Sequence, residues 1–266
     1  MPPIPDKQKS DAVPWLQNKS PQAASVFSPD ALLREARRQK GLAPLDVPAV
    51  CIFDPDGDIL RQLRKSGRAT RFDAWPCYHT ELYTFRLGEQ TVGIVVGAPF
   101  AVLIAEELFA CGCRFLLSLT SAGQINAAGP TPYFVVIDRA LRDEGTSYHY
   151  AAPAEFAEAD AKLVATAANA LKQAGLRILV GASWTTDAPF REAAEAIESA
   201  RAKGVLAVEM EAAALYTFAR TRGKSVLCLA HVTNTMGQAE RDFEKGESDG
   251  TIDALNVLET IVKTAT

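Results

Sequence analysis

The sequence lacks the features that mark membrane, secreted and nucleic-acid-binding proteins. No apolar run in its 266 residues approaches the ~18 residues of a membrane-spanning helix, and residues 1–7 contain no apolar signal segment. Positive charge is not in excess either, because the formal net charge is −4. The chain therefore has no general electrostatic attraction for nucleic acid or for an anionic membrane. We expect a cytoplasmic protein that binds neither.

Cysteine is scarce and scattered, and this limits metal and disulfide chemistry. The five cysteines are widely spaced, and only Cys111 and Cys113 lie close together. A zinc site read from sequence needs Cys or His pairs at short spacing twice over, and there is no second pair. The pattern predicts no metal site. Most of the cysteines have apolar neighbours, which is typical of small core residues in a reducing compartment.

The rest of the composition is that of a globular protein, with 48% hydrophobic and 23% charged residues. Residues 1–24 are rich in Pro, Ser, Gln and Asn and predict a flexible N-terminal arm. Residues 25–266 then form the folded domain, which is long enough to bury a large core. Ser28 followed by Pro29 predicts the start of a helix, with Ser28 as its N-cap.

Short apolar runs alternate with helical segments along this domain. Continuous apolar runs predict buried strands at 48–53, 91–96, 115–119, 133–137, 177–182 and 226–232, with a further hairpin strand at 83–87. Helices are expected at 29–38, 59–65, 100–111, 158–174, 212–221 and 248–265. Apolar strands between helices predict an α/β fold, a single three-layer domain whose central sheet is flanked by helices.

Small or polar clusters follow these predicted strands. They are 56–58, 97–98, 120–123, 185–187 and 233–235. In open α/β sheets, ligands bind beyond the carboxyl ends of the strands. The sequence therefore predicts one pocket at which these clusters converge.

Two carboxylates flank Met210 just before an alanine-rich segment, in the order Glu209-Met210-Glu211. A carboxylate accepts both hydrogen bonds of a cis-diol, so this pair suits the hydroxyls of a ribose or the amides of a base. A glutamate near a helix N-terminus also simply complements the helix dipole. Residue types alone favour this second interpretation.

Two other segments have the chemistry of an anion site. Gly57 lies in a turn before a predicted helix that carries Arg61, and helix N-termini and arginines both bind phosphate. A plain turn followed by a surface arginine explains that pattern equally well. Ser121, in the cluster 120–123, offers a hydroxyl and a backbone amide to phosphate or to a sugar oxygen, although an isolated turn of this kind is unremarkable.

Aromatic and polar side chains are dense in two further segments. Residues 142–150 could form the rim of a pocket or a hydrogen-bonded turn. In 185–192, Phe190 offers a ring for base stacking and Arg191 a donor for a carbonyl, whereas the alternative is a capped helix start. His79 and His231 stand alone, and we expect both to be packed rather than catalytic.

Taken in this order, the segments resemble the nucleoside phosphorylase family, which includes uridine phosphorylase, hexameric purine nucleoside phosphorylase and methylthioadenosine nucleosidase. The resemblance covers about residues 25–262. It rests most on 208–211 and is supported by 142–149 and 186–191. It implies a single α/β domain around a mixed, partly barrel-like sheet, assembled as a homodimer or homohexamer. Uridine phosphorylase-like members are the most similar.

The resemblance also implies roles for individual residues. Glu211 would hold the ribose hydroxyls, and Met210 would pack against the sugar. Gly57 and Arg61 match the phosphate loop Gly-Asp-Pro-x-Arg, with Ile59 in place of the proline. Residue Ser121 aligns with a position between phosphate and ribose. The base-binding residues would be Phe190, Arg191, Glu209 and Asn234.

The implied reaction is the attack of phosphate on C1′ of a nucleoside while the base departs, through an oxocarbenium-like state. Phosphate is a co-substrate, and no cofactor is implied. The protein would place the anion beneath the sugar and hydrogen-bond the leaving base. Glu211, Asn234 and Arg191 are the catalytic residues that the resemblance implies.

Several positions depart from the family pattern. Ser118 stands where the phosphorylases carry a phosphate-binding arginine, which nucleosidases also lack. Asn234 replaces the aspartate of purine-specific members, as in pyrimidine enzymes, and an amide is no general acid. Thr235 replaces an arginine, and Ser28 stands near the place of a histidine that reaches the neighbouring subunit.

Three hypotheses follow. The leading one is a phosphorylase of a pyrimidine-like nucleoside such as uridine. The second is a nucleosidase that uses water, favoured by Ser118. The third is a nucleoside-binding homologue without catalysis.

Overall fold

The computed structural model describes residues 21, 23, 25, 27–97, 101–235 and 245–264. The predicted N-terminal arm lies almost entirely outside these residues, as does Phe100, the predicted first residue of a helix. The helices are α1 (Pro29–Lys40), α2 (Asp58–Lys65), α3 (Ala101–Ala110), α4 (Ala161–Gln173), α5 (Ala194–Ala202), α6 (Ala212–Arg222) and α7 (Thr251–Val262), with short 3-10 turns η4 (Ser147–His149), η5 (Pro189–Arg191) and η6 (Glu247–Gly250). Among the described residues, no helix has the length and apolar character that a membrane crossing requires.

All strands belong to one mixed sheet. They are β1 (Val50–Phe53), β2 (Thr70–Arg71), β3 (Leu82–Leu87), β4 (Gln90–Val95), β5 (Phe115–Gln124), β6 (Tyr133–Asp143), β7 (Phe156–Glu158), β8 (Ile178–Thr186), β9 (Val205–Glu209) and β10 (Ser225–Asn234). Strands β10, β6, β8, β9 and β5 follow one another, and β5 pairs again with β10, which closes a barrel. From β5 the sheet continues through β1, β4, β3 and β2.

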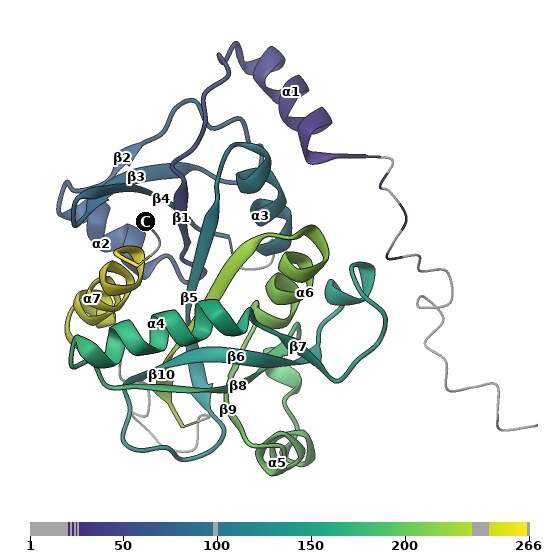
Figure 1. Cartoon of the computed structure of the whole chain (residues 1–266), viewed down its shortest axis with the longest axis vertical. Coiled ribbons are helices and arrows are strands. Elements are labelled where there is room, and N and C mark those ends of the chain that lie inside the picture. Colours follow the sequence, from purple (N-terminus) through teal and green to yellow (C-terminus); the bar gives the residue numbers. More distant parts are fainter. Residues whose placement is uncertain are drawn as a thin grey trace, which may run out of the picture.

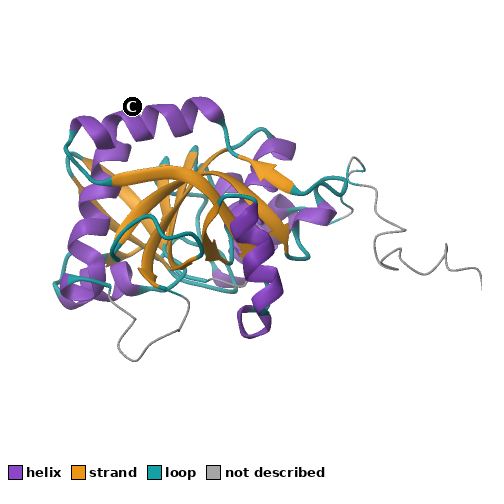
Figure 2. Ribbon diagram, turned by 90° about the horizontal axis from the view of Figure 1, so that it is seen from below, coloured by secondary structure: helices purple, strands orange, loops and turns teal. Residues whose placement is uncertain are grey.

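Helices flank this barrel-like sheet on its outer sides (Figures 1 and 2). Helix α7 packs against α2 and α4, whereas α3 packs against α1 and α6. The predicted α/β class and the mixed, partly barrel-like sheet are confirmed. Ser28 caps α1 as predicted, because its hydroxyl accepts a hydrogen bond from the backbone N–H of Ala31 at 3.3 Å.

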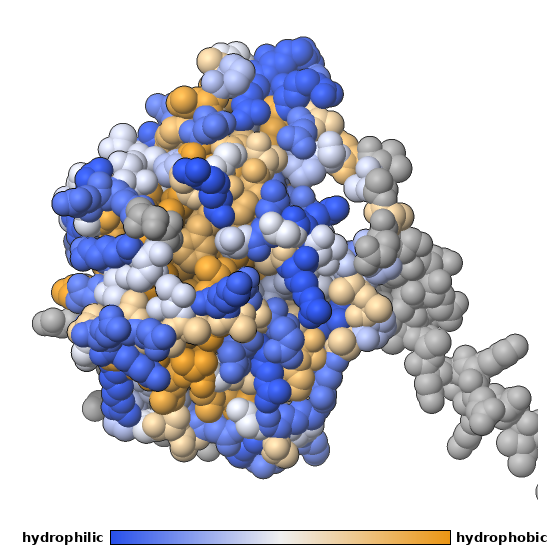
Figure 3. All heavy atoms as spheres, in the orientation of Figure 1, coloured by the Kyte–Doolittle hydropathy of each residue, from blue (hydrophilic) through white to orange (hydrophobic). Residues whose placement is uncertain are grey.

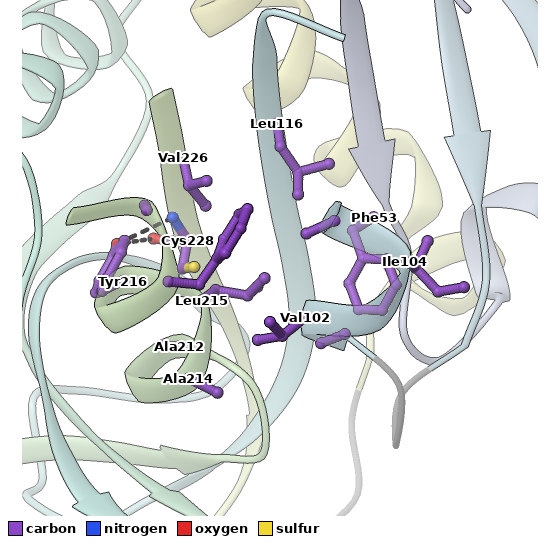
Figure 4. Packing of buried hydrophobic residues seen from close by; sticks show 14 of the residues in the cluster. Phe53, Val102, Ile104, Leu116, Ala212, Ala214, Leu215, Tyr216, Val226 and Cys228 are labelled. Atoms are coloured by element: carbon purple, nitrogen blue, oxygen red, sulfur yellow. Dashed lines mark hydrogen bonds between the residues drawn. The ribbon is translucent and has the colours of Figure 1, made fainter. Parts of the chain in front are cut away.

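The two helical layers bury opposite faces of the same strands. Successive side chains of a strand point to opposite faces, so β1 divides its residues between two cores. Cys51 and Phe53 belong to the core beneath α1, α3 and α6, shown in Figure 4. Val50 and Ile52 belong to the core beneath α2, α4 and α7. This is why the sequence of β1 is apolar throughout.

Several predicted boundaries were wrong. Strand β5 does not stop at Thr120 but continues to Gln124, and β6 runs on to Asp143. The polar residues Thr120 and Ser121 remain in the strand because β10 pairs with them through Ala230 and His231. Four elements were missed altogether, namely β2, β7, α5 and β9. Strand β9 ends at Glu209, so the two glutamates of the motif belong to a strand end and a helix start.

The hydroxyl of Tyr216 joins α6 to two strands of the barrel. It donates to the carbonyl of Ile137 in β6 at 2.6 Å and accepts from the backbone N–H of Cys228 in β10 at 2.9 Å. Tyr216 is buried, and Figure 4 shows its hydroxyl beside Cys228. The side chain therefore satisfies backbone groups of β6 and β10 that are buried beneath α6.

We expect Tyr216→Phe to lower the free energy of unfolding by about 2–3 kcal/mol, because it leaves buried backbone groups without partners. Urea unfolding followed by circular dichroism measures this. Tyr78→Phe is the matched control, since that exposed hydroxyl donates to the side chain of Gln39 at the surface, and it should change stability by less than about 0.5 kcal/mol. Equal effects of the two substitutions would refute a structural role for the Tyr216 hydroxyl.

Candidate functional site

The segment Glu209-Met210-Glu211 joins β9 to α6 at the mouth of the barrel. Glu209 and Glu211 are buried, with 4% and 2% of their surface exposed, whereas Met210 is 38% exposed. The strand registers place this segment beside β5 and β8, because Gly123 pairs with Val208 and Thr185 pairs with Glu209. The two glutamates therefore lie where several strand ends meet.

Four donors surround the carboxylate of Glu209. The hydroxyls of Ser183 and Thr185 donate to one oxygen at 2.9 and 2.5 Å. The backbone N–H groups of Glu211 and Ala212 donate to the other, both at 2.7 Å. Burial raises the pKa of Glu209 above its usual range, although these four bonds oppose the rise. Glu209 thus caps the start of α6 through the backbone N–H groups of Glu211 and Ala212. Its contact with a base stays a prediction.

Glu211 has a different environment. Burial raises the pKa of its carboxyl well above the usual range, and the nearby charges of Glu209 and Asp56 act in the same direction. The backbone N–H of Met210 donates to its carboxylate at 3.4 Å. The site thus holds a buried carboxyl among other acids, an arrangement that disfavours negative charge and favours a positively charged or hydrogen-donating ligand.

The loop after β1 reaches Ser121 through a carboxylate. Asp56 accepts hydrogen bonds from the backbone N–H of Ser121 at 2.7 Å and from its hydroxyl at 3.0 Å. Gly57 follows Asp56 with a left-handed conformation, φ 72°, and begins α2. The structure therefore brings the predicted anion-binding residues Gly57 and Ser121 to one place. Asp56 holds both donors of Ser121.

The guanidinium of Arg61 is also paired with a carboxylate, that of Asp58. Lys245 approaches the same carboxylate at 2.5 Å. Burial would raise the pKa of Asp58, but the hydrogen bonds from Lys245 and Arg61 lower it below its usual range. Two cations therefore meet beside the start of α2, next to Gly57. Lys245 was not identified from the sequence, because it reaches this loop only through the fold.

Two positions that depart from the family pattern lie on the neighbouring strands. Ser118 is buried in β5, and its hydroxyl has no hydrogen-bond partner among the described residues. Asn234 ends β10 opposite Gly123, and its side-chain oxygen accepts a bond from Thr233 at 3.3 Å. Because Gly123 also pairs with Val208, Asn234 lies within about two strand spacings, ~10 Å, of the glutamate segment.

The structure does not bring the predicted base-binding residues Phe190 and Arg191 to this place. Both lie in the turn η5 after β8, and Phe190 is 99% exposed. Arg191 is exposed as well. The hydroxyl of Thr186 accepts from the backbone N–H of Ala188 at 3.2 Å, which fixes the start of the turn. The turn itself presents both side chains to the surface.

A recess of about 1170 Å³ opens beside Met210. It is bounded by α1, α3, one side of α6 along its length and the loop 144–150, and it lies below α1 at the right of Figure 3. Its volume is large enough for a nucleoside. Glu144 lines it, is 6% exposed, and accepts one bond from the backbone N–H of Ser147, while its other oxygen has no partner among the described residues.

The loop 142–150 is held firmly rather than forming a loose rim. The side chain of Arg142 is buried and donates to the hydroxyl of Ser147 and the carbonyl of Ala152, both at 2.8 Å. The backbone N–H of Gly145 donates to Asp187 at 2.7 Å. The hydrogen-bonded turn expected as one alternative is therefore present, while Glu144 faces the recess.

Asp54, Asp56 and Asp58 form an acidic loop for which the sequence predicted no role. Asp54 accepts from the backbone N–H of Leu60 at 2.8 Å and fixes the start of α2. Burial raises the pKa of Asp54 to about 7, and the charges of Asp56 and Asp58 add to the effect. The sequence signal for this loop was the alternation of acids at 54, 56 and 58 directly after an apolar strand. The segment was interpreted as a glycine turn instead.

Comparisons with known proteins find a matching family model and several similar sequences. The family model described as the phosphorylase superfamily matches residues 49–263. A guanosine phosphorylase of Halorubrum lacusprofundi is 30% identical over 48% of the chain, and a uridine phosphorylase of Thermococcus kodakarensis is 28% identical over 54%. These matches span 53% and 58% of the relatives' own lengths.

Solved structures of similar proteins share the fold. A uridine phosphorylase of Vibrio fischeri superposes with a TM-score of 0.69 at 23% identity, over 82% of this chain and 95% of that one. A purine nucleoside phosphorylase of Toxoplasma gondii, solved with immucillin-H, also gives a TM-score of 0.69, at 16% identity over 83% and 90% of the two chains. The relatives thus include proteins named for both pyrimidine and purine nucleosides.

The raised pKa of Asp54 predicts a pH dependence of stability. The folded pKa of about 7 exceeds the ordinary value of 3.8, so protonated Asp54 stabilises the fold fully below about pH 4, and this contribution is lost as the pH rises through 7. In Asp54→Asn the neutral amide removes this titration. Between about pH 4 and 8, the stability of the wild type should fall by roughly 4 kcal/mol relative to the variant.

Urea unfolding at a series of pH values measures the difference. Asp73→Asn serves as the control for replacing an acid by an amide, because the side chain of Asp73 is 84% exposed. A difference for Asp54→Asn that stays constant with pH would contradict the prediction.

Proposed function

Since the chain belongs to the phosphorylase superfamily, we propose that it is a nucleoside phosphorylase, a pentosyltransferase that cleaves the N-glycosidic bond of a nucleoside. Phosphate is the co-substrate, and no cofactor takes part. The products are ribose 1-phosphate and the free base. The observation that carries this proposal is the buried carboxyl of Glu211, which lies beside Met210 and near the charge of Asp56, the residue that accepts from Ser121.

The carboxyl of Glu211 suits the ribose for two reasons. A ribose cis-diol donates two hydrogen bonds to one carboxylate, and Met210 offers an apolar surface for the sugar ring beside it. Positive charge develops at C1′ as the base departs, and this charge favours the ionised form of Glu211, which burial and the charge of Asp56 disfavour in the empty site. Preorganised charge of this kind stabilises the transition state more than the substrate.

The substrate we propose is a pyrimidine-like nucleoside such as uridine. Asn234 supports this, because a neutral amide at the end of β10 hydrogen-bonds a base without protonating it. We further propose that the protein works in the cytoplasm as a homodimer or homohexamer. A second subunit would offer a way to cover Phe190, which is exposed in the single chain.

A panel of purine and pyrimidine nucleosides, each incubated with and without phosphate, tests the proposal. We expect base release from a pyrimidine nucleoside only when phosphate is present. Glu211→Gln should lower kcat/KM by about 100-fold to 1000-fold, because the carboxylate that stabilises the transition state is lost. Glu198→Gln, on the exposed face of α5, is the control and should retain full activity.

Three outcomes would redirect the assignment. Release from purines alone would overturn the pyrimidine specificity. Release that ignores phosphate would identify a nucleosidase instead. Thermal stabilisation by nucleosides with no base released from any of them would identify a binding protein.

A nucleosidase is the second candidate, and one observation favours it. The carboxylate of Asp56 holds the hydroxyl and the amide of Ser121, the donors that phosphate would need. A carboxylate in this place is suited to accept a proton from an attacking water. Ser118, in place of the family arginine, leaves the anion side of the site with less positive charge.

Asp56→Asn separates the two reactions. If phosphate is the nucleophile, the substitution removes a competing negative charge, and the KM for phosphate should fall, by about threefold to tenfold, with kcat largely kept. If water is the nucleophile, the loss of the base should lower kcat by about 100-fold or more. Steady-state kinetics over a range of phosphate concentrations measures both constants, and an Asp56→Asn variant indistinguishable from the wild type would remove Asp56 from either mechanism.

A further inference from the structure

Three potential metal ligands meet beside α3, outside the glutamate segment and the anion loop described above. They are Cys77 and His79, in the segment between β2 and β3, and Glu107 in α3. The thiol sulfur, the imidazole Nδ1 and a carboxylate oxygen all lie within 4.8 Å of one another. The Nδ1 atom of His79 is 3.8 Å from the sulfur of Cys77 and 3.7 Å from Oε1 of Glu107.

Glu107 is the member of this cluster that most needs an explanation. Only 1% of its surface is exposed, and neither carboxylate oxygen has a hydrogen-bond partner among the described residues. Its polar neighbours are the other two members of the cluster, and a buried carboxylate without a hydrogen-bond partner is unfavourable unless it has a further role. The adjacent Glu106 behaves differently, because it accepts from the hydroxyl of Tyr150 at 3.0 Å and pairs with Arg222.

The segment that carries Cys77 and His79 is already held in place. Lys40, at the end of α1, donates to the carbonyls of Pro76 and Cys77 at 2.8 and 2.6 Å. The indole of Trp75 donates to the carbonyl of Thr80 at 3.1 Å and closes the segment into a loop. The ammonium of Lys40 is thus engaged with carbonyl oxygens, so it does not neutralise Glu107 by a direct hydrogen bond.

We propose that Cys77, His79 and Glu107 form a zinc site with three protein ligands and one open position. Zinc binds thiolate sulfur at about 2.3 Å and imidazole nitrogen or carboxylate oxygen at about 2.0–2.2 Å. Tetrahedral geometry then separates ligand atoms by about 3.3–3.6 Å. The separations of His79 Nδ1 from the Cys77 sulfur and from Glu107 Oε1, 3.8 and 3.7 Å, are within a few tenths of an ångström of this arrangement.

The donor set selects the metal. One sulfur, one imidazole nitrogen and one carboxylate oxygen suit zinc, whereas magnesium and calcium prefer oxygen ligands alone. Three protein ligands with an open fourth position are typical of zinc sites that bind water or a further ligand. The side chain of His79 is 37% exposed, and Glu107 lines the recess beside α3, so an ion has a route to the cluster.

The ion would tie the loop 75–80 to α3, which forms one wall of the recess. This inference stands apart from the proposed nucleoside chemistry, because it shares no residue with the glutamate segment or with the anion loop. It also replaces the expectation from the sequence, in which the cysteine spacing predicts no metal. Spacing could not identify this site, since the fold alone brings Glu107 to the other two residues.

The test is a titration of untagged protein, first treated with a chelator and then dialysed, with Zn²⁺ and separately with Co²⁺. We expect one equivalent of metal per chain by calorimetry and elemental analysis, and a thiolate-to-cobalt charge-transfer band in the Co²⁺ form. Cys77→Ser should abolish that band and weaken Zn²⁺ binding by roughly 100-fold or more, since one of three ligands is lost. Glu107→Gln should weaken binding as well.

Cys113→Ala is the matched control, because Cys113 is a buried cysteine outside the cluster, and it should bind metal as the wild type does. Circular dichroism checks that each variant is folded. The proposal is overturned if the folded wild type binds no stoichiometric Zn²⁺, or if Cys77→Ser binds it as tightly as the wild type. Should Cys77→Ser not fold, the wild-type Co²⁺ spectrum decides alone, and the absence of a thiolate band rejects the site.

Discussion

The geometry of the candidate site depends on how the buried carboxylate of Glu209 is satisfied. Ionised, it accepts four hydrogen bonds, two from hydroxyls of β8 and two from the first backbone amides of α6. These bonds fix the angle at which the chain leaves β9 and enters the helix. Residues Met210 and Glu211 lie within that turn, so their positions follow from it. Without the Glu209 contacts, the N-terminus of α6 would be buried with unpaired donors, which proteins avoid.

Once Glu209 fixes the turn, Glu211 is forced into a cluster of acids. Its neighbours include Glu209 itself and Asp56, and burial keeps water from screening their charges. Such a cluster is unfavourable in the empty protein, which is why the pKa of Glu211 is raised. The same repulsion becomes useful when a ligand brings hydroxyl donors or developing positive charge. This repulsion destabilises the folded protein at the place where a sugar would be recognised, a pattern common at functional sites.

Much of the fold and part of this site could be predicted from local sequence. The runs 48–53 and 226–232 could be predicted as strands because a strand buried on both faces needs apolar residues at successive positions. The predicted strands β5 and β6 ended too early. In β5 the polar residues Thr120 and Ser121 stay in the strand because β10, which is distant in sequence, pairs with them. The glutamate segment was found from its residue types and its order among other motifs. Long-range partners such as Asp56 for Ser121 follow only from the tertiary structure, and so does the exposure of Phe190.

The anion side of the site differs from the sugar side because its donors already hold carboxylates. Ser121 is engaged by Asp56, and Arg61 and Lys245 meet at Asp58. A phosphate ion must therefore displace acidic groups from these donors before it binds, and it meets repulsion from any that stay charged. Its affinity depends on how readily the loop 54–58 rearranges, because each lost charge-assisted bond must be replaced by one to the ion. Water meets no such competition. The choice between phosphate and water as nucleophile thus rests on the loop after β1, while recognition of the sugar rests on the turn before α6.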